Sequence, residues 1–215
     1  MGKLFAIGDI HGCLSKLEAL IPQIGIDSDN DTLIFIGDYI DRGLDSRGVV
    51  DLVLDLKTRV RSVICLRGNH EQMFLDYVCR GMNEDLYLFN GGDATIASYG
   101  YRATSEGRKI DVPDDHMGFF RSLLLWCETD DYIFVHAGLR DRIPLHEQDA
   151  HDLLWVRHEF IRSSYDFGKT VVFGHTPVSH TDPLFLPGKI GIDTGAVYGG
   201  PLTCVELPLQ KVYQA

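Results

Sequence analysis

The sequence predicts a single α/β domain over residues 1–215, and two observations indicate this fold class. Short apolar runs alternate along the chain with longer amphipathic stretches, which is the pattern of strands alternating with helices. The composition, with 45% hydrophobic and 24% charged residues, is that of an ordinary globular protein with a sizeable core. No internal repeat, low-complexity segment or Pro/Ser-rich linker divides the chain.

The apolar runs are too short for helices and therefore predict strands. In order, the expected strands are Leu4–Ile7, Thr32–Ile36, Ser62–Leu66, Tyr132–Val135, Thr170–Phe173, Ile190–Ile192 and Leu202–Leu207. The longer stretches with helical spacing of apolar residues predict helices over Ser15–Ile24, Ser46–Thr58, Glu71–Arg80, Asp115–Cys127 and His151–Ser163. Turn-forming residues predict loops around Asn90-Gly91-Gly92, over Gly100–Pro113, and within the glycine-rich stretch Gly188–Gly200.

The chain is acidic, with 20 Lys+Arg against 31 Asp+Glu and a net charge of −11. This balance argues against a nucleic-acid partner, although bound metal ions could still attract a small anion. No apolar run reaches the length of a membrane span, and the N-terminal residues show no signal-peptide pattern. We therefore expect a cytoplasmic protein without a membrane partner. Its five widely spaced cysteines are expected to be buried, reduced thiols.

Five polar clusters follow directly on predicted strands, at the strand ends where ligands bind in open α/β sheets. Their sequences are GDIHG from Gly8, GDYIDRG from Gly37, GNHE from Gly68, HAG from His136 and GHT from Gly174. In an extended segment, residues two apart face the same side, so Asp9 and His11 can face one ion. For that cluster alone, a plain turn between glycines is the alternative. Five such clusters together indicate a functional site.

The clusters offer carboxylate, amide and imidazole donors without a thiolate. Such a set suits Mn²⁺, Fe or Zn²⁺, and does not suit a cysteine-rich zinc finger. The number of donors exceeds the needs of one ion. The sequence therefore predicts a pair of divalent metal ions.

Taken in order, the five motifs resemble the phosphoprotein phosphatase family within the calcineurin-like metallophosphoesterases, in particular its short bacterial and phage enzymes. The motifs span residues 8 to 176, and the segment from Asp193 to Thr203 resembles the closing segment of bacterial members, including diadenosine tetraphosphate hydrolases. The resemblance implies a four-layer αββα sandwich, with two mixed sheets packed face to face, helices outside, and the metal site at one end.

The resemblance also implies a role for each matching residue. The implied metal ligands, with Asp38 shared by both ions, are Asp9, His11, Asp38, Asn69, His136 and His175. A hydroxide that bridges the ions would attack phosphorus in line with the leaving oxygen. His70, oriented by Asp41, would protonate the leaving alkoxide as the general acid.

Substrate binding is assigned to four residues, two of them arginines whose planar guanidinium suits phosphate oxygens. These residues are Arg42, Arg157, Asn69 and Tyr198. Arg157 is chosen because Trp155-Val156-Arg157 resembles a bacterial W-x-R element, with Arg140, Arg142 and Arg162 as alternatives. The histidines outside these roles, His116, His146, His151, His158 and His180, are expected to be structural or solvated, as is Glu71 at a helix start.

Three functions fit this pattern. The first is a metal-dependent protein phosphatase for phosphoserine, phosphothreonine or phosphotyrosine, and the second is a hydrolase of dinucleoside polyphosphates. The third, a non-catalytic relative that binds phosphorylated partners, is disfavoured because every implied metal ligand is present, as are the implied general acid His70 and its partner Asp41. The short chain, without a basic cluster for four phosphates, favours the phosphoprotein or a small phosphate ester over the dinucleotide. Nothing in the sequence indicates an oligomeric state.

Overall fold

Two five-stranded sheets form the centre of the protein and confirm the α/β fold class in a computed structural model that describes residues 2–105, 107–178 and 181–215. The first sheet has the order β12-β11-β1-β2-β3. Its strands are β1 (Leu4–Ile7), β2 (Thr32–Phe35), β3 (Ser62–Cys65), β11 (Thr203–Leu207) and β12 (Lys211–Gln214). β1, β2 and β3 are parallel, whereas β11 and β12 join them antiparallel.

The second sheet has the order β6-β7-β8-β10-β9. Its strands are β6 (Trp126–Glu128), β7 (Tyr132–Val135), β8 (Thr170–Phe173), β9 (Leu184–Leu186) and β10 (Lys189–Gly191). The three central strands are parallel and the two edge strands antiparallel. Both sheets are therefore mixed, as the family resemblance implied.

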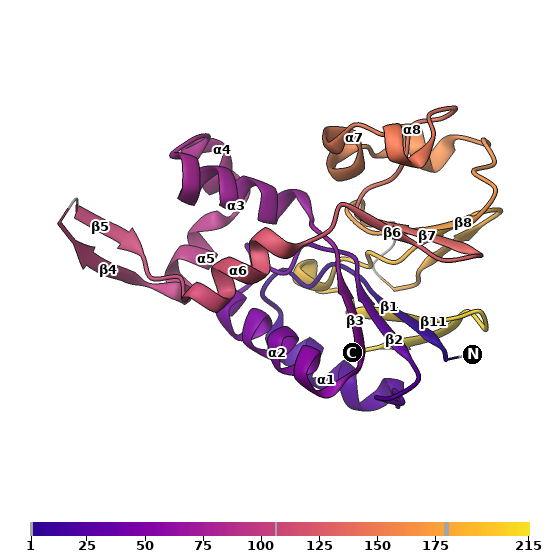
Figure 1. The fold of residues 1–215 in the computed structure, drawn as a ribbon, viewed down its shortest axis with the longest axis horizontal. Helices are drawn as coiled ribbons and strands as arrows, with labels where there is room; N and C mark the ends of the chain where they lie inside the picture. Colours follow the sequence, from indigo (N-terminus) through magenta and orange to yellow (C-terminus); the bar gives the residue numbers. More distant parts are fainter. Residues whose placement is uncertain (1, 106, 179–180) are drawn as a thin grey trace.

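The layers follow from the alternation of side chains along the strands. On β2, Leu33 and Phe35 face the helices, while Ile34 and Ile36 face the second sheet, where they meet Phe134 and other apolar residues. The helices α1 (Leu14–Ile24), α2 (Ser46–Arg59), α3 (Asn69–Arg80) and α6 (Asp114–Ser122) cover the outer face of the first sheet. The short helices α7 (Ala150–Trp155) and α8 (His158–Arg162) cover the second sheet (Figure 1). The result is the αββα sandwich.

The predicted helix His151–Ser163 is wrong in one respect, because it is two helices. Val156 and Arg157 leave the helical conformation between α7 and α8, with φ −61° and ψ 142° at Val156. At this break the Val156 side chain is buried in the apolar cluster that the second sheet forms with α7 and α8, here called the outer core. Phe160 belongs to the same cluster. The predicted helix Asp115–Cys127 is also too long. It ends at Ser122, and Trp126–Glu128 form the edge strand β6.

The segment between α3 and α6 is more ordered than the turn residues predicted. It contains α4 (Glu84–Phe89), α5 (Gly92–Tyr99) and a hairpin of β4 (Tyr101–Thr104) and β5 (Gly107–Ile110). The hairpin projects away from the sandwich, at the left of Figure 1. Gly91 and Gly100, with φ of 91° and 73°, mark the ends of α5, so these glycines indicated element boundaries rather than a long loop. The short edge strand β9 and the terminal β12 were not predicted.

Two further expectations concern cysteines and membranes. All five cysteines are free, but only Cys65 and Cys204 are buried. Cys13 and Cys127 are half-buried and Cys79 is exposed, so the prediction of buried thiols was wrong for Cys79 and only partly right for Cys13 and Cys127. In the described parts of the chain, no helix has the length and apolar character needed to cross a bilayer.

Candidate metal centre

The carboxyl ends of β1 and β2 place three proposed ligands against one another. The backbone N–H groups of Ile10 and His11 both donate to the carbonyl oxygen of Asp38, at 3.0 and 2.8 Å, which locks the two strand ends together. His11 and Asp38 have φ of 47° and 51°, and His175 on the second sheet has 64°. Non-glycine residues rarely adopt positive φ, and such backbones gather at functional sites. The local strain turns these side chains into a common space.

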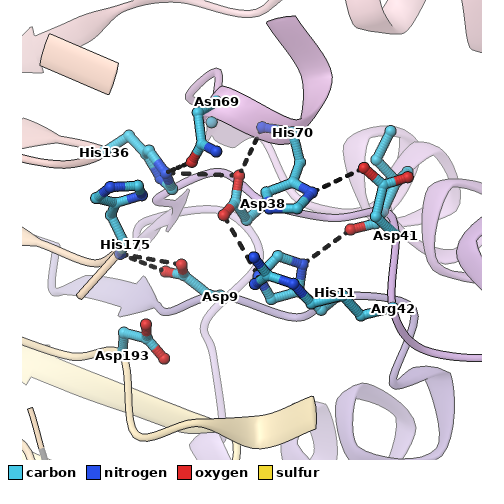
Figure 2. A network of polar contacts seen from close by, with 12 residues as sticks. Asp9, His11, Asp38, Asp41, Arg42, Asn69, His70, His136, His175 and Asp193 are labelled. Carbon is cyan, nitrogen blue, oxygen red and sulfur yellow. Dashed lines mark hydrogen bonds and ion pairs between the residues drawn. The ribbon is translucent and has the colours of Figure 1, made fainter. Parts of the chain in front are cut away.

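Asp38 lies at the centre of the cluster, as Figure 2 shows. One carboxylate oxygen lies 3.4 Å from Nε2 of His11, and the other lies 3.5 Å from Nε2 of His136. Nε2 of His136 is also 3.0 Å from Oδ1 of Asn69. All four side chains are buried. The arrangement has two halves with the carboxylate of Asp38 between them, a geometry compatible with the shared ligand that the resemblance implied.

The protonation of the histidines is compatible with a bound cation. Burial lowers the pKa of His11 to about 3 and also lowers that of His136, so both rings are neutral near pH 7. A neutral imidazole carries one N–H, and Nδ1 of each ring contacts a backbone carbonyl, of Ile40 at 2.9 Å and of Ile36 at 3.1 Å. Each Nε2 then carries a lone pair that lies near a carboxylate oxygen of Asp38, and Nε2 of His11 also lies 2.6 Å from Nη1 of Arg42. Neutral imidazole nitrogens grouped around a shared carboxylate are a donor set that fits a divalent cation.

Further observations fit the same conclusion. Nε2 of His175 is buried without a hydrogen-bond partner among the described residues, and burial lowers the pKa of His175 to about 2. Burial, together with the carboxylates of Asp193 and Asp38, raises the pKa of Asp9 well above its ordinary value. A Cβ on Gly174 would lie 2.0 Å from a carboxylate oxygen of Asp9. The glycine therefore leaves room for that carboxylate, and the uncompensated donors fit divalent metal ions.

Two geometric groups of potential ligands occur among the described residues, and they share Asp38. One consists of His11, Asp38 and His70, and the other of Asp38, His136 and His175. Asp9 lies outside both groups, and its carboxylate accepts the backbone N–H of His175 at 2.9 Å. His70 lies inside one of them, although the sequence assigned it to acid catalysis. The structure thus brings all six proposed ligands to one place, with His70 beside them.

His70 forms a buried dyad with Asp41. Nδ1 of His70 lies 2.7 Å from Oδ2 of Asp41, and Nε2 of His70 has no partner among the described residues. Burial alone would lower the pKa of His70, but Asp38 and Asp41 outweigh burial and raise it. A raised pKa with Nε2 directed toward the centre is what a proton donor requires.

Two residues that the sequence did not single out hold Asp41 in place. Oδ1 of Asp41 accepts the hydroxyl of Tyr87 at 2.9 Å and the hydroxyl of Thr95 at 2.6 Å. The backbone N–H of Asp41 donates to hydroxyl oxygens of Thr95 and Ser46. Tyr87 and Thr95 belong to α4 and α5, two helices that the sequence analysis did not predict. No motif marks these residues, so the sequence carried no signal for them.

Glu71 and Asp193 complete the polar surroundings. The carboxylate of Glu71 accepts the backbone N–H groups of Asp38, Tyr39 and Gly68, at 3.0, 2.8 and 2.9 Å, which supports the structural role expected for it. Asp193 is 5% exposed and lies beside Asp9 (Figure 2). Its Oδ1 accepts the N–H of Gly195 at 2.9 Å, and burial raises its pKa to about 6. The sequence placed Asp193 in the closing segment without giving it a role.

The predicted substrate-binding residues lie around the centre. Nη1 of Arg42 is 2.6 Å from Nε2 of His11, and its guanidinium lies 5.6 Å from the ring centroid of Tyr198, which is 57% exposed. Arg157 is exposed at the start of α8. Its charge contributes to lowering the pKa of His175, behind the larger effects of burial and of His136.

The remaining histidines fall outside the centre or outside the described residues. His116 is buried between the hydroxyl of Tyr99 and the carboxylate of Asp51, at 2.8 and 3.0 Å, in a structural role. His146, His151 and His158 are exposed, as expected for solvated side chains. His180 lies outside the described residues.

The fold and the centre define a class, a hydrolase that acts on phosphate esters, and comparisons with known proteins agree. The profile of the Calcineurin-like phosphoesterase family matches residues 2–210, so the chain belongs to this family. It is 32% identical to serine/threonine-protein phosphatase 1 of Salmonella typhimurium, over 95% of this chain and 91% of that protein. It is 28% identical to bis(5'-nucleosyl)-tetraphosphatase PrpE of Anoxybacillus flavithermus, over 94% and 89%. The crystal structure of a putative diadenosine tetraphosphatase superposes with a TM-score of 0.76 at 24% identity, over 100% and 93% of the chains, which supports the fold.

Proposed function

We propose that this single-domain protein is a two-metal phosphomonoesterase that removes phosphate from phosphorylated serine or threonine side chains, or tyrosine side chains, of cytoplasmic proteins. The observation that carries the proposal is the His70–Asp41 dyad beside two ligand groups that share Asp38. A proton donor next to a metal centre suits a phosphomonoester, whose leaving alkoxide must be protonated.

The residues present fit two divalent ions, with Mn²⁺ proposed first and Fe or Zn²⁺ as alternatives. Asp9, His11 and Asp38 would hold one ion. The other ion would be held by Asp38 together with Asn69, His136 and His175. The chemistry that such ions supply is Lewis-acid activation of the phosphate ester and of water at neutral pH.

The chain's own residues perform the remaining steps. His70 donates the proton on Nε2 to the leaving oxygen, while Asp41 holds the ring through Nδ1 and stabilises its charged form. Arg42 and Arg157 bind the non-bridging phosphate oxygens from two sides, and Asn69 and Tyr198 contact the substrate at the edge of the centre. Fixed donors of this kind stabilise the charge that develops in the transition state without reorganising.

Similarity supports the phosphoprotein substrate, because the Salmonella relative named a serine/threonine-protein phosphatase aligns over 91% of its own length. A second candidate substrate is a dinucleoside polyphosphate such as diadenosine tetraphosphate. The observation that favours it is the 28% identity to the bacterial tetraphosphatase PrpE over nearly the whole chain. Parallel assays with phosphopeptides and diadenosine tetraphosphate in Mn²⁺ discriminate the two candidates.

The assignment of His70 is tested by the variant His70→Asn. Turnover on alkyl phosphates should fall about 10²- to 10⁴-fold, while the loss on p-nitrophenyl phosphate should be much smaller, because nitrophenolate leaves without a proton. Metal content, measured by elemental analysis, should stay at the wild-type level. Loss of one metal equivalent with equal loss on both substrates would instead make His70 a ligand, which its position in a ligand group allows.

A further inference from the structure

A cavity of about 640 Å³ opens beside the metal centre, between the loop after β7 and the helices α7 and α8. Arginine side chains from three positions line it, Arg140, Arg157 and Arg162. The sequence offered no contiguous basic cluster, because these arginines are spread over 23 positions, numbered 140 to 162. The fold gathers them in one place.

The charge in this cavity is only partly balanced. Arg140 pairs with Asp152 at 2.8 Å, so its charge is compensated. Arg157 and Arg162 form no ion pair among the described residues, and Glu159, which also lines the cavity, is not within ion-pair distance of either. Two guanidinium groups therefore remain available to an anion. On a chain with a net charge of −11, such a local excess of positive charge is a specific feature.

The cavity adjoins the proposed active site. Trp155 lines it and contacts His175 edge-on, with ring centroids 6.0 Å apart. Arg157, the second proposed phosphate-binding arginine, also lines it. A ligand in the cavity would thus share one arginine with the phosphate at the centre. Because a guanidinium reaches only its immediate neighbours, the two anionic groups would lie close enough to be adjacent parts of one substrate.

We propose that this cavity is a second anion subsite, which binds a negatively charged group of the substrate next to the phosphate that is hydrolysed. Arg162 is its principal residue, and Arg157 joins it to the centre. The proposal rests on the phosphoesterase function proposed above and deepens it by naming the substrate class. The group is the carboxylate of an acidic residue beside a phosphorylated residue, or the next phosphate of a polyphosphate chain, which have the same chemistry at the arginines.

The test compares substrates with and without the second anion. Two phosphopeptides that differ only in a neutral or an acidic residue beside the phosphorylated residue form one pair. Tripolyphosphate is the polyphosphate arm, and p-nitrophenyl phosphate, which has no second anion, is the reference. Free Mn²⁺ is held constant because polyphosphates chelate it. The measured quantity is the ratio of kcat/KM for each second-anion substrate to that for p-nitrophenyl phosphate.

For the wild type we expect a ratio that favours at least one second-anion substrate and declines with added salt. Arg162→Ala should lower that ratio about tenfold, as expected for a lost charge-assisted hydrogen bond, and Arg162→Glu should lower it further. The matched control is Arg61→Ala, an exposed arginine before β3, at the opposite end of the strands from the centre. It should leave every ratio unchanged.

The outcomes separate this proposal from the proposed function. Preference for the acidic peptide identifies a protein substrate, and preference for tripolyphosphate identifies a polyphosphate. Equal kcat/KM for acidic and neutral peptides, with no preference for tripolyphosphate, overturns the subsite while p-nitrophenyl phosphate hydrolysis upholds the phosphatase. An unchanged ratio in both Arg162 variants overturns it as well. Absence of hydrolysis of every substrate refutes the phosphatase function instead.

Discussion

At the scale of single residues, the centre is built from backbone strain as much as from side-chain chemistry. Eight described non-glycine residues have positive φ, and five of them are proposed site residues: His11, Asp38, Asp41, Arg42 and His175. All five contribute side chains to the polar cluster shown in Figure 2. The motifs predicted these residues from their chemistry, but the strain that positions them is visible only in the folded chain.

The same scale shows what the motifs could not predict. Tyr87 and Thr95 contact Asp41 from helices 46 and 54 positions further along the chain. Neither residue type has a motif around it, and a buried tyrosine is usually read as part of the core. Only the folded structure shows that their hydroxyl groups donate hydrogen bonds to the carboxylate that orients His70.

The first residue-scale prediction concerns Tyr87. The variant Tyr87→Phe keeps the ring but removes one of the two hydroxyl donors to Oδ1 of Asp41. We expect kcat on alkyl phosphates to fall about tenfold, equivalent to about 1.4 kcal/mol, because Asp41 then holds His70 less firmly. The loss on p-nitrophenyl phosphate should be smaller, since that leaving group does not need the proton.

Tyr99→Phe is the matched control for this experiment. Tyr99 is also buried in the helical core, but its hydroxyl contacts His116 rather than Asp41. The control should lose a similar amount of stability without changing the dependence of the rate on the leaving group. If both variants show the same kinetics on the two substrates, Tyr87 is a packing residue and not a positioning residue.

At the scale of elements, the sequence predicted the parallel core well and its surroundings less well. The strands β1, β2, β7 and β8 are short, mainly apolar runs, and their positions were predicted within one residue. The helices α4 and α5 are short, and glycines at their boundaries look like loop residues. The break between α7 and α8 follows from packing of Val156 in the outer core, a tertiary cause that helical periodicity does not contain.

An element-scale prediction follows from the way α8 ends. Nζ of Lys189, on β10, donates to the carbonyl oxygens of Phe160, at 2.7 Å, and Ser163, so a buried lysine binds carbonyls at the end of this helix. Lys189→Met leaves these carbonyls without that donor. We expect the free energy of unfolding to fall by about 1–3 kcal/mol, measured as a lower midpoint in urea at constant m-value.

Lys169→Met provides the comparison for Lys189. Lys169 also donates to a backbone carbonyl, of Thr129 at 2.6 Å, but its side chain is 27% exposed, so water can replace the lost donor. Its loss of stability should be clearly smaller. Equal midpoints for Lys189→Met and the wild type would show that the carbonyls at the end of α8 find other donors.

At the scale of the whole molecule, the metal centre joins the two sheets. Asp9 and Asp38 follow β1 and β2 of the first sheet, whereas His136 and His175 follow β7 and β8 of the second. The family resemblance placed the site at one end of the sandwich, but which groups remain unpaired there is a property of the folded protein. Buried carboxylates and lone pairs that face one another oppose docking of the sheets. Bound cations remove this repulsion and so should stabilise the whole fold.

The last prediction tests that link between metal and stability. A ligand that binds only the folded state stabilises it by RT ln(1 + [L]/Kd), about 2.7 kcal/mol at a hundredfold excess over Kd. For a chain of this size we expect Mn²⁺ to raise Tm by about 5–10 °C above the chelated protein, and to restore hydrolysis of p-nitrophenyl phosphate. Asp38→Asn should abolish most of this rise, because Asp38 is common to both ligand groups. A Tm that is the same with Mn²⁺ and with chelator, in a protein that remains active when elemental analysis finds no metal, would contradict both the centre and its role in holding the sheets together.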